Sequence, residues 1–346
     1  MSDSNNGLSQ EQQYVLKLVR NRKSVFFTGP AGTGKSYLLK HIIAHFKVKE
    51  IPIAITASTG MAALNIKGKT LHSFAGVGLA KDSAETLLER IKKNIGLLQR
   101  WKTTHTLIID EVSMIEANFF DKLEYIARKL RRTRDGQEKP FGGMQLVITG
   151  DFFQLPPVPD TSFNHGKNLP RFAFEAKSWM SCIEEPVFLT HVFRQTDSTF
   201  IRILGNMRKG VLENRDIDLL KGLSRPLDFL DDIEPVELFP VRKQVDTCNK
   251  EKLDALPDSQ HIYYAMDALG DDMSKIPIPK DNSEAVFERF AAPAIVILKI
   301  GAQVMLVQNI SQPKELSEKL VNGSLVNVKY GQLSTFLRLR TYRRWY

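Results

Sequence analysis

The stretch GPAGTGKS at residues 29–36 constrains the fold of this chain more than any other. It matches the pattern G-x-x-x-x-G-K-[ST], follows the apolar run SVFFT and precedes the helical run YLLKHIIAHF. In this strand–loop–helix setting, backbone N–H groups and the helix N-terminus face the phosphates of a nucleotide. Lys35 is placed to reach the β- and γ-phosphates, and Ser36 to ligate Mg²⁺. The pattern predicts a phosphate-binding loop, because a Gly-rich turn that arose by chance would not need a strand before it and a helix after it.

Two polar segments follow later apolar runs, as the remaining parts of a nucleotide site should. DEVSM (110–114) ends the run TLIID, so we expect Asp110 to hold Mg²⁺ through its water shell. Glu111 is placed to orient or deprotonate the attacking water. In GDFFQLPPV (150–158), Gln154 can donate to the γ-phosphate and accept from water. The alternatives are a plain helix cap for the acidic pair and a proline turn for QLPP.

Five short apolar runs alternate with amphipathic stretches along the first 190 residues. They are SVFF (24–27), IPIAIT (51–56), TLIID (106–110), MQLVIT (144–149) and PVFLT (186–190). Short β-rich runs separated by helical patterns indicate a parallel sheet with helices on both faces. We therefore expect an α/β fold of the P-loop NTPase class.

Two changes in amino-acid composition along the chain indicate its domain organisation. The charged helical stretch KDSAETLLERIKKNIGLLQRW (81–101) is typical of a small insertion. The Pro- and Asp-rich passage SRPLDFLDDIEP (224–235) indicates a linker between domains. A second α/β region is then expected to begin with VELFPVRKQVDTCNKEKL (236–253).

The composition of the chain indicates which classes of partner and site to expect. The formal net charge of +9 favours polyanions, with nucleic acid as the first candidate. Cys182 and Cys248 are too few for a disulfide framework or a zinc site. The apolar runs are all shorter than the 18 or so residues that a membrane span needs, so we expect an intracellular soluble protein.

Eight segments occur in one order: LSQEQ, GPAGTGKSYLL, ITASTGMAAL, TLHSFAG, IIDEVSM, GDFFQLPPV, FRQ and LKIGAQVMLVQN. Together they resemble the Pif-type (petite integration frequency) DNA helicases of superfamily one, in the branch that moves 5′ to 3′ on single strands. FDKLEYIARKLR (120–131) resembles the signature helix of that family. The cations at its end are either phosphate ligands or residues that favour a helix C-terminus: Arg128, Lys129, Arg131, Arg132 and Arg134.

The resemblance implies a role for each matching position, with ATP as substrate and Mg²⁺ as cofactor. The implied ATP-binding residues are Gln12, at the adenine, and Gly29, Pro30, Ala31, Gly32, Thr33, Gly34, Lys35, Ser36 and Tyr37. The implied catalytic residues are Lys35, Asp110, Glu111, Gln154 and Arg194, the last as an arginine finger. Ser36 and Asp110 are the implied Mg²⁺ ligands. Two alternatives stay open: Gln12 in a capping box that starts at Ser9, and Arg194 as a surface ion-pair partner.

The resemblance also implies contacts with DNA. Thr59, His72 and Phe74 match segments that line the DNA path, and 77–101 occupies the place of the family's small wedge-like subdomain. The alternatives are loop hydrogen bonds for Thr59 and His72 and a core position for Phe74. We expect single-stranded and forked or structured DNA as partners, a monomer, and no membrane.

The resemblance divides the chain into three parts. They are a first RecA-like ATPase domain over 1–225 with the insertion 77–101, the start of a second RecA-like domain over 226–325, and a basic tail, 326–346, unlike the family. Segments resembling the family's later motifs, S-I-H-K-S-Q-G and Y-V-A-L-S-R, are missing. We therefore expect a second domain that is truncated and incomplete.

Two readings of function follow. The first is an ATP-dependent 5′-to-3′ DNA helicase in genome maintenance, covering replication, repair, recombination and telomeres. The second is a truncated ATP- and DNA-binding fragment without unwinding activity. The N-terminus MSDSNNGLSQEQQ carries no import sequence, which predicts the nucleus, or the mitochondrion if an N-terminal region is missing.

Overall fold

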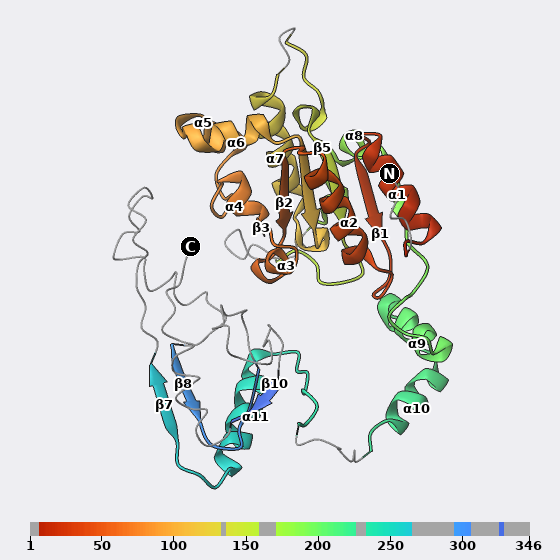
Figure 1. Ribbon diagram of the computed structural model, residues 1–346, viewed down its shortest axis with the longest axis vertical. Helices are drawn as coiled ribbons and strands as arrows, with labels where there is room; N and C mark the ends of the chain where they lie inside the picture. Colours follow the sequence, from red (N-terminus) through yellow and green to blue (C-terminus); the bar gives the residue numbers. More distant parts are fainter. Residues whose placement is uncertain are drawn as a thin grey trace. The chain divides into compact units, whose positions relative to one another are not determined.

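The computed structural model describes residues 7–132, 136–158, 171–225, 233–264, 294–305 and 325–328. The chain divides into two compact units, Met1–Ser224 and Arg225–Tyr346. The first unit contains the predicted phosphate loop and is built around a six-stranded sheet (Figure 1).

The sheet of the first unit is entirely parallel. Its strands are β1 (Val25–Thr28), β2 (Ile53–Ala57), β3 (Lys69–Thr70), β4 (Thr106–Asp110), β5 (Gln145–Thr149) and β6 (Glu185–Phe188). Their order in the sheet is β3-β2-β4-β5-β1-β6, with every neighbouring pair parallel. The predicted α/β fold and its five strands are confirmed, and β3 is an edge strand that carries no apolar run. Because β1, β4 and β5 are neighbours, the segments that follow them meet at one edge of the sheet.

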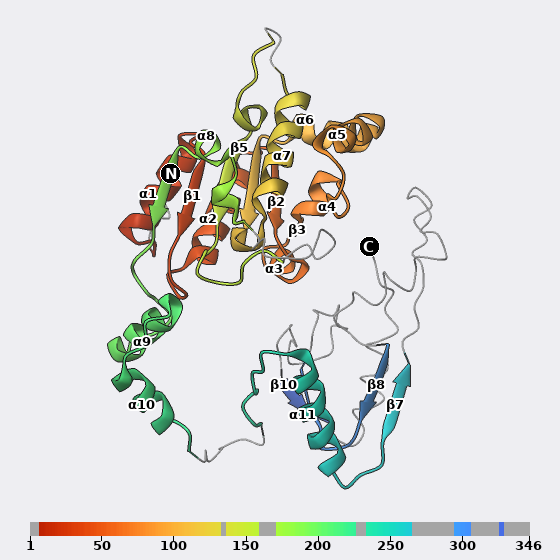
Figure 2. The same ribbon diagram turned by 180° about the vertical axis from the view of Figure 1, so that it is seen from behind.

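Helices cover both faces of this sheet (Figure 1 and Figure 2). They are α1 (Gln10–Arg20), α2 (Lys35–Val48), α3 (Gly60–Asn65), α4 (Leu71–Ala75), α5 (Ala84–Lys93), α6 (Ile95–Thr103), α7 (Ala117–Leu130) and α8 (Trp179–Cys182). Two further helices, α9 (Ser198–Lys209) and α10 (Asn214–Gly222), follow β6 and lie beyond its end, away from the faces of the sheet. Short 3₁₀ turns lie at η1 (Val112–Met114), η2 (Pro140–Gly143) and η3 (Ala173–Glu175).

Strand periodicity separates the core into two layers, since successive side chains point to opposite faces of a strand. Phe27 and Ile108 pack with α1 and α2 in one layer. Phe26, Leu107 and Ile109 pack with α4 to α8 in the other. The strands are therefore apolar on both faces, as a parallel sheet covered by helices requires.

The insertion forms two helices, α5 and α6, joined at Asn94, whose side chain caps α6. Leu87, Leu88 and Ile91 give α5 its buried face. At the end of α6, Trp101 is fully buried and its indole N–H donates to the carbonyl of Ala75 at 3.1 Å. The insertion is therefore anchored to the body of the unit at its base.

In the second unit, α11 (Arg242–Ala255) precedes two antiparallel strand pairs among the described residues. β7 (His261–Tyr264) pairs with β8 (Ile295–Leu298), which has the apolar sequence IVIL. β9 (Gln303–Met305) pairs with β10 (Leu325–Asn327). The segment 320–324 and the tail from residue 329 lie outside the described residues. In the described part of the chain, no helix is long and apolar enough to cross a membrane.

Candidate functional site

The predicted phosphate loop connects the end of β1 to the start of α2. Gly32 and Gly34 adopt positive φ angles of 85° and 79°, where a side chain is strained. A Cβ at Gly32 would lie 2.9 Å from Cβ of Arg194, and one at Gly34 would lie 2.6 Å from Nε2 of Gln12. The loop therefore packs directly against two other segments that the sequence predicted to meet it.

Lys35 folds back onto its own loop. Its Nζ donates to the carbonyls of Gly29 at 2.7 Å and Pro30 at 3.1 Å. Burial lowers the pKa of the ammonium, and the nearby carboxylates of Asp151 and Glu111 oppose this effect. A phosphate is a charged acceptor and forms stronger hydrogen bonds than these carbonyls, so it can draw Lys35 away from them.

Gln12 satisfies the capping-box alternative. Its Oε1 accepts from the Ser9 backbone N–H at 2.9 Å, and the Gln12 backbone N–H donates to the Ser9 hydroxyl. Its Nε2 also donates to the Thr33 carbonyl at 3.1 Å, which joins α1 to the phosphate loop. The side chain keeps one amide hydrogen and one lone pair, so a contact with adenine stays a prediction.

The acidic pair lies at the end of β4. Burial raises the pKa of Asp110 to about 6, with a further contribution from the adjacent Glu111 carboxylate. Glu111 has a φ of 53° and makes no side-chain cap bond to η1, so the helix-cap alternative is not what the structure contains. A strained non-Gly residue of this kind is typical of a functional site.

The residues present fit Mg²⁺. The Asp110 carboxylate and the exposed Ser36 hydroxyl are hard oxygen ligands, and a dication would favour the charged forms of the crowded acids. Among the described residues, no group of three or more His, Cys, Asp and Glu side chains could hold a metal. An Mg²⁺ here would take its remaining ligands from phosphates and water.

The loop after β5 is organised around Asp151, which is 1% exposed. Arg208, on α9, donates to both of its carboxylate oxygens, at 2.6 and 2.8 Å. Burial alone would raise the pKa of Asp151, but the hydrogen bonds from Arg208 and the Phe153 amide hold it below its ordinary value. Gln154 is exposed, and its Nε2 lies 3.3 Å from Oδ2 of Asp151. Asp151 and Arg208 were not predicted from the sequence. For Asp151 a signal was present, because it is an acid that closely follows an apolar strand.

Arg194 lies beside the phosphate loop. The amide of its neighbour Phe193 donates to the Gly32 carbonyl at 2.8 Å, which fixes this segment against the loop. The Arg194 side chain is exposed, and its Cβ lies beside Gly32. Within the described ranges it forms no ion pair, which was the predicted alternative, so an arginine-finger role stays a prediction.

Comparisons with known proteins agree with this geometry. The PIF1-like helicase family model matches residues 7–217. The chain belongs to the PIF1-like helicase family. It is 46% identical over 324 residues to the ATP-dependent DNA helicase PIF1 of Emericella nidulans, covering 92% of this chain and 40% of that protein.

Two solved structures of Pif1 helicases show the same fold. The enzyme from Candida albicans matches with a TM-score of 0.76 and 40% identity, covering 96% of this chain and 72% of that one. The enzyme from Bacteroides, in complex with ADP-AlF3 and ssDNA, matches with a TM-score of 0.59 and 27% identity, covering 93% and 70%. The predicted resemblance is confirmed. The present chain spans less than half the length of the curated PIF1 and RRM3 helicases that it matches.

The three DNA-contact candidates of this PIF1-like chain lie in different surroundings. Thr59 caps α3, accepting from the Ala62 amide at 3.2 Å, as the loop alternative predicts. His72 is partly buried, and its ring stacks on Phe119 with centroids 4.2 Å apart. Phe74 is 1% exposed and packs on Trp101, which is the core position that its alternative predicts. A ring buried in the core offers no face for a base to stack on.

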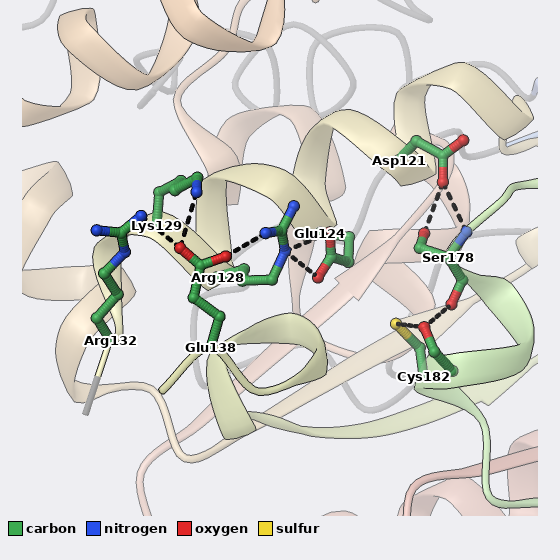
Figure 3. Close-up of polar contacts among 9 residues, drawn as sticks. Asp121, Glu124, Arg128, Lys129, Arg132, Glu138, Ser178 and Cys182 are labelled. Carbon is green, nitrogen blue, oxygen red and sulfur yellow. Dashed lines mark hydrogen bonds and ion pairs between the residues drawn. The ribbon is translucent and has the colours of Figure 1, made fainter. Parts of the chain in front are cut away.

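The segment that resembles the family's signature helix is α7, and its apolar residues Leu123, Ile126, Ala127 and Leu130 are buried. Three cations at its end form ion pairs with acids of the same chain (Figure 3). Arg128, Lys129 and Arg132 all pair with Glu138, and Arg128 also bonds Glu124 at 2.9 Å. The hydrogen bond from Lys129, with those from the two arginines, holds the pKa of Glu138 at about 2.

Arg131, on the same helix, has a different role. Its guanidinium donates to the carbonyls of Trp101 at 2.7 Å, Lys102 at 2.8 Å and Gly142 at 3.1 Å. It therefore joins the signature helix to the end of the insertion. Each of the four cations that the structure describes has an acceptor within the chain, and Arg134 lies outside the described residues. Phosphate binding by these cations, one of the two alternatives, stays a prediction.

Proposed function

We propose that this chain binds and hydrolyses ATP and that, as part of a PIF1-like helicase, it couples hydrolysis to 5′-to-3′ movement on single-stranded DNA. The observation that carries the proposal is a single juxtaposition. The phosphate loop, the acidic end of β4, the Asp151–Gln154 loop and the Arg194 segment all lie at the carboxyl edge of one parallel sheet.

Each group in this juxtaposition has a chemical task in phosphoryl transfer. Lys35 leaves its loop carbonyls to bind the β- and γ-phosphates, beside the loop N–H groups. Glu111 orients the attacking water and accepts its proton. Gln154 contacts the γ-phosphate, and Arg194 approaches the same oxygens as charge develops on them. Ser36 and Asp110 would hold Mg²⁺, which would supply positive charge beside the phosphate oxygens when bound.

The proposed partner is DNA. The net charge of +9 favours a polyanion, and Thr59 and His72 are the retained candidates for contacts with it. A structure of the Bacteroides relative contains ssDNA, and another solved structure concerns DNA unwinding at forked dsDNA by two coordinating Pif1 helicases. Single-stranded and forked DNA are therefore the proposed substrates of this monomer, in genome maintenance within the nucleus.

Strand displacement on two matched substrates tests this proposal. One labelled duplex carries a 5′ single-stranded tail and the other a 3′ tail of the same length and sequence composition. With ATP and Mg²⁺ we expect release of the strand from the 5′-tailed duplex alone. The Lys35→Ala variant is the control and should release neither.

Each other outcome has a definite meaning. Release from the 3′-tailed duplex alone would overturn the direction of movement. Binding of ATP and single-stranded DNA without release from either duplex would instead favour the second candidate, an ATP- and DNA-binding chain that does not unwind. Equal release by the Lys35→Ala variant would overturn the role of the phosphate loop.

A further inference from the structure

The contact between Arg208 and Asp151 is the most completely buried ion pair at the nucleotide site. The side chains are 12% and 1% exposed, and the two hydrogen bonds are bidentate. A buried carboxylate that loses its partner is costly, so the pair constrains both segments strongly. Its position at the site, not its strength, suggests a role in the reaction.

The Asp151 carboxylate is the centre of the sensor loop, which we define as residues 151–154. Besides Arg208, its oxygens accept from the Phe153 amide at 3.2 Å and from Nε2 of Gln154 at 3.3 Å. The backbone of Gln154 also donates to the Asp151 carbonyl at 2.9 Å. The side chain proposed to contact the γ-phosphate is therefore oriented by the same carboxylate that Arg208 holds.

Arg208 has one further contact in this region. Its guanidinium lies 4.3 Å from the centroid of the exposed Phe153 ring, within cation–π range. The guanidinium therefore holds the sensor loop at two points, the Asp151 carboxylate and the Phe153 ring.

The helix that carries Arg208 is itself placed firmly. Its neighbour α10 contributes Asp216, fully buried, which pairs with Arg202 at 2.6 Å and accepts from Asn206 at 2.8 Å. Helix α9 begins at Ser198, four residues after Arg194, with Asp197 as its N-cap. One helix therefore connects the proposed arginine finger at one end with the sensor loop at the other.

We propose that Arg208 is a positioning residue for recognition of the γ-phosphate. Through Asp151 it sets the orientation of Gln154, and it links that orientation to α9 and so to Arg194. This inference rests on the proposed function, because it assumes that Gln154 meets the γ-phosphate. It assigns no direct phosphate contact to Arg208 itself.

A comparison of nucleotide affinities tests the inference without requiring turnover. Dissociation constants of ADP and of ATPγS are measured with Mg²⁺ by displacement of a fluorescent ADP analogue from the full chain. The readout is the ratio of the ADP constant to the ATPγS constant. We expect Arg208→Gln to lower this ratio about fivefold, the value of one hydrogen bond, and to change the ADP constant by less than about twofold.

A double-mutant cycle with Asp151→Asn identifies the route of the effect. If Arg208 acts through Asp151, the two single variants and the double variant lower the ratio equally. A double variant that lowers it about 25-fold would mean independent contacts with the nucleotide and would overturn the inference. A wild-type ratio in Arg208→Gln, or an equal loss for ADP and ATPγS, would overturn it as well.

Arg202→Gln is the matched control, because it removes an arginine of the same helix that pairs with Asp216 instead. It should lower the melting temperature and leave the ratio unchanged. If Arg208→Gln fails to fold, two other variants are measured instead. They are the double variant, which leaves no unpaired buried charge, and Arg208→Lys, which keeps the positive charge. In that case an unchanged ratio in both would overturn the inference. Failure of nucleotide to bind to the wild-type chain, or equal binding to Lys35→Ala, would overturn the proposed function, and with it the inference.

Discussion

Replacing Gly32 by alanine tests how the phosphate loop and the Arg194 segment fit together. A new Cβ would lie 2.9 Å from Cβ of Arg194 and 3.2 Å from Cγ1 of Val192. The Cβ of Arg194 is attached directly to the backbone, so the segment must move rather than rotate a side chain. Gly78→Ala is a matched control, because Gly78 has a positive φ of 57° but no atom within 4 Å of its added Cβ.

Both substitutions carry the cost of an alanine at positive φ, and Gly32→Ala alone also displaces a packed segment. Holding an alanine at positive φ costs about 1–2 kcal/mol in either variant. Displacing a packed segment adds about 1–3 kcal/mol for Gly32→Ala alone. At about 2–4 °C per kcal/mol for a unit of this size, Gly78→Ala should melt roughly 2–8 °C lower than wild type, and Gly32→Ala lower still.

Thermal unfolding by circular dichroism and binding of a fluorescent ADP analogue measure both effects. We expect Gly78→Ala to bind nucleotide as wild type does, and Gly32→Ala to bind at least about tenfold more weakly. Equal melting temperatures and equal nucleotide affinities in the two variants would refute the reasoning, since the close packing would then have no consequence.

Three further predictions concern residues outside the loop. Phe74→Leu should lower the free energy of unfolding by about 1 kcal/mol in urea and leave the affinity for single-stranded DNA unchanged by fluorescence anisotropy; a large loss of affinity would restore the DNA-contact role. Glu138 has a folded pKa of about 2, below its ordinary value of 4.5, so its contribution to stability is present above pH 4.5 and lost as pH falls toward 2. The melting temperature of Glu138→Gln should accordingly be lower than that of wild type at pH 7 and converge with it below pH 4.5, whereas a constant difference would contradict this. Arg131→Gln should lower the free energy of unfolding by about 1–3 kcal/mol in urea, because carbonyls at the end of α6 lose their donor, and an unchanged midpoint would contradict that role.

The nucleotide site was predictable because its parts are contiguous patterns. The loop of residues 29–36 follows β1 directly, the pair Asp110–Glu111 lies at the end of β4, and Gln154 lies in the loop after β5. Parallel neighbours bring these strand ends together. The order of these short segments along the chain was therefore enough to predict which side chains meet.

Contacts between distant segments were not predictable in the same way. Arg208 lies 57 residues from Asp151, and nothing in the sequence around Arg208 distinguishes it from the other cations of an amphipathic helix. The pairing of three cations with Glu138 depends on how the connection after α7 folds back. Phe74 lies in a helix of five residues, too short for periodicity to tell a buried face from an exposed one.

ATP turnover by the 346-residue chain, with and without single-stranded DNA, tests the central claim most directly. Lys35→Ala is the matched control, because it removes the phosphate-binding ammonium and leaves the rest of the loop in place. We predict turnover that single-stranded DNA stimulates and that disappears in the variant. Turnover that is equal in wild type and Lys35→Ala, or indifferent to DNA, would contradict the account of a nucleotide site coupled to DNA.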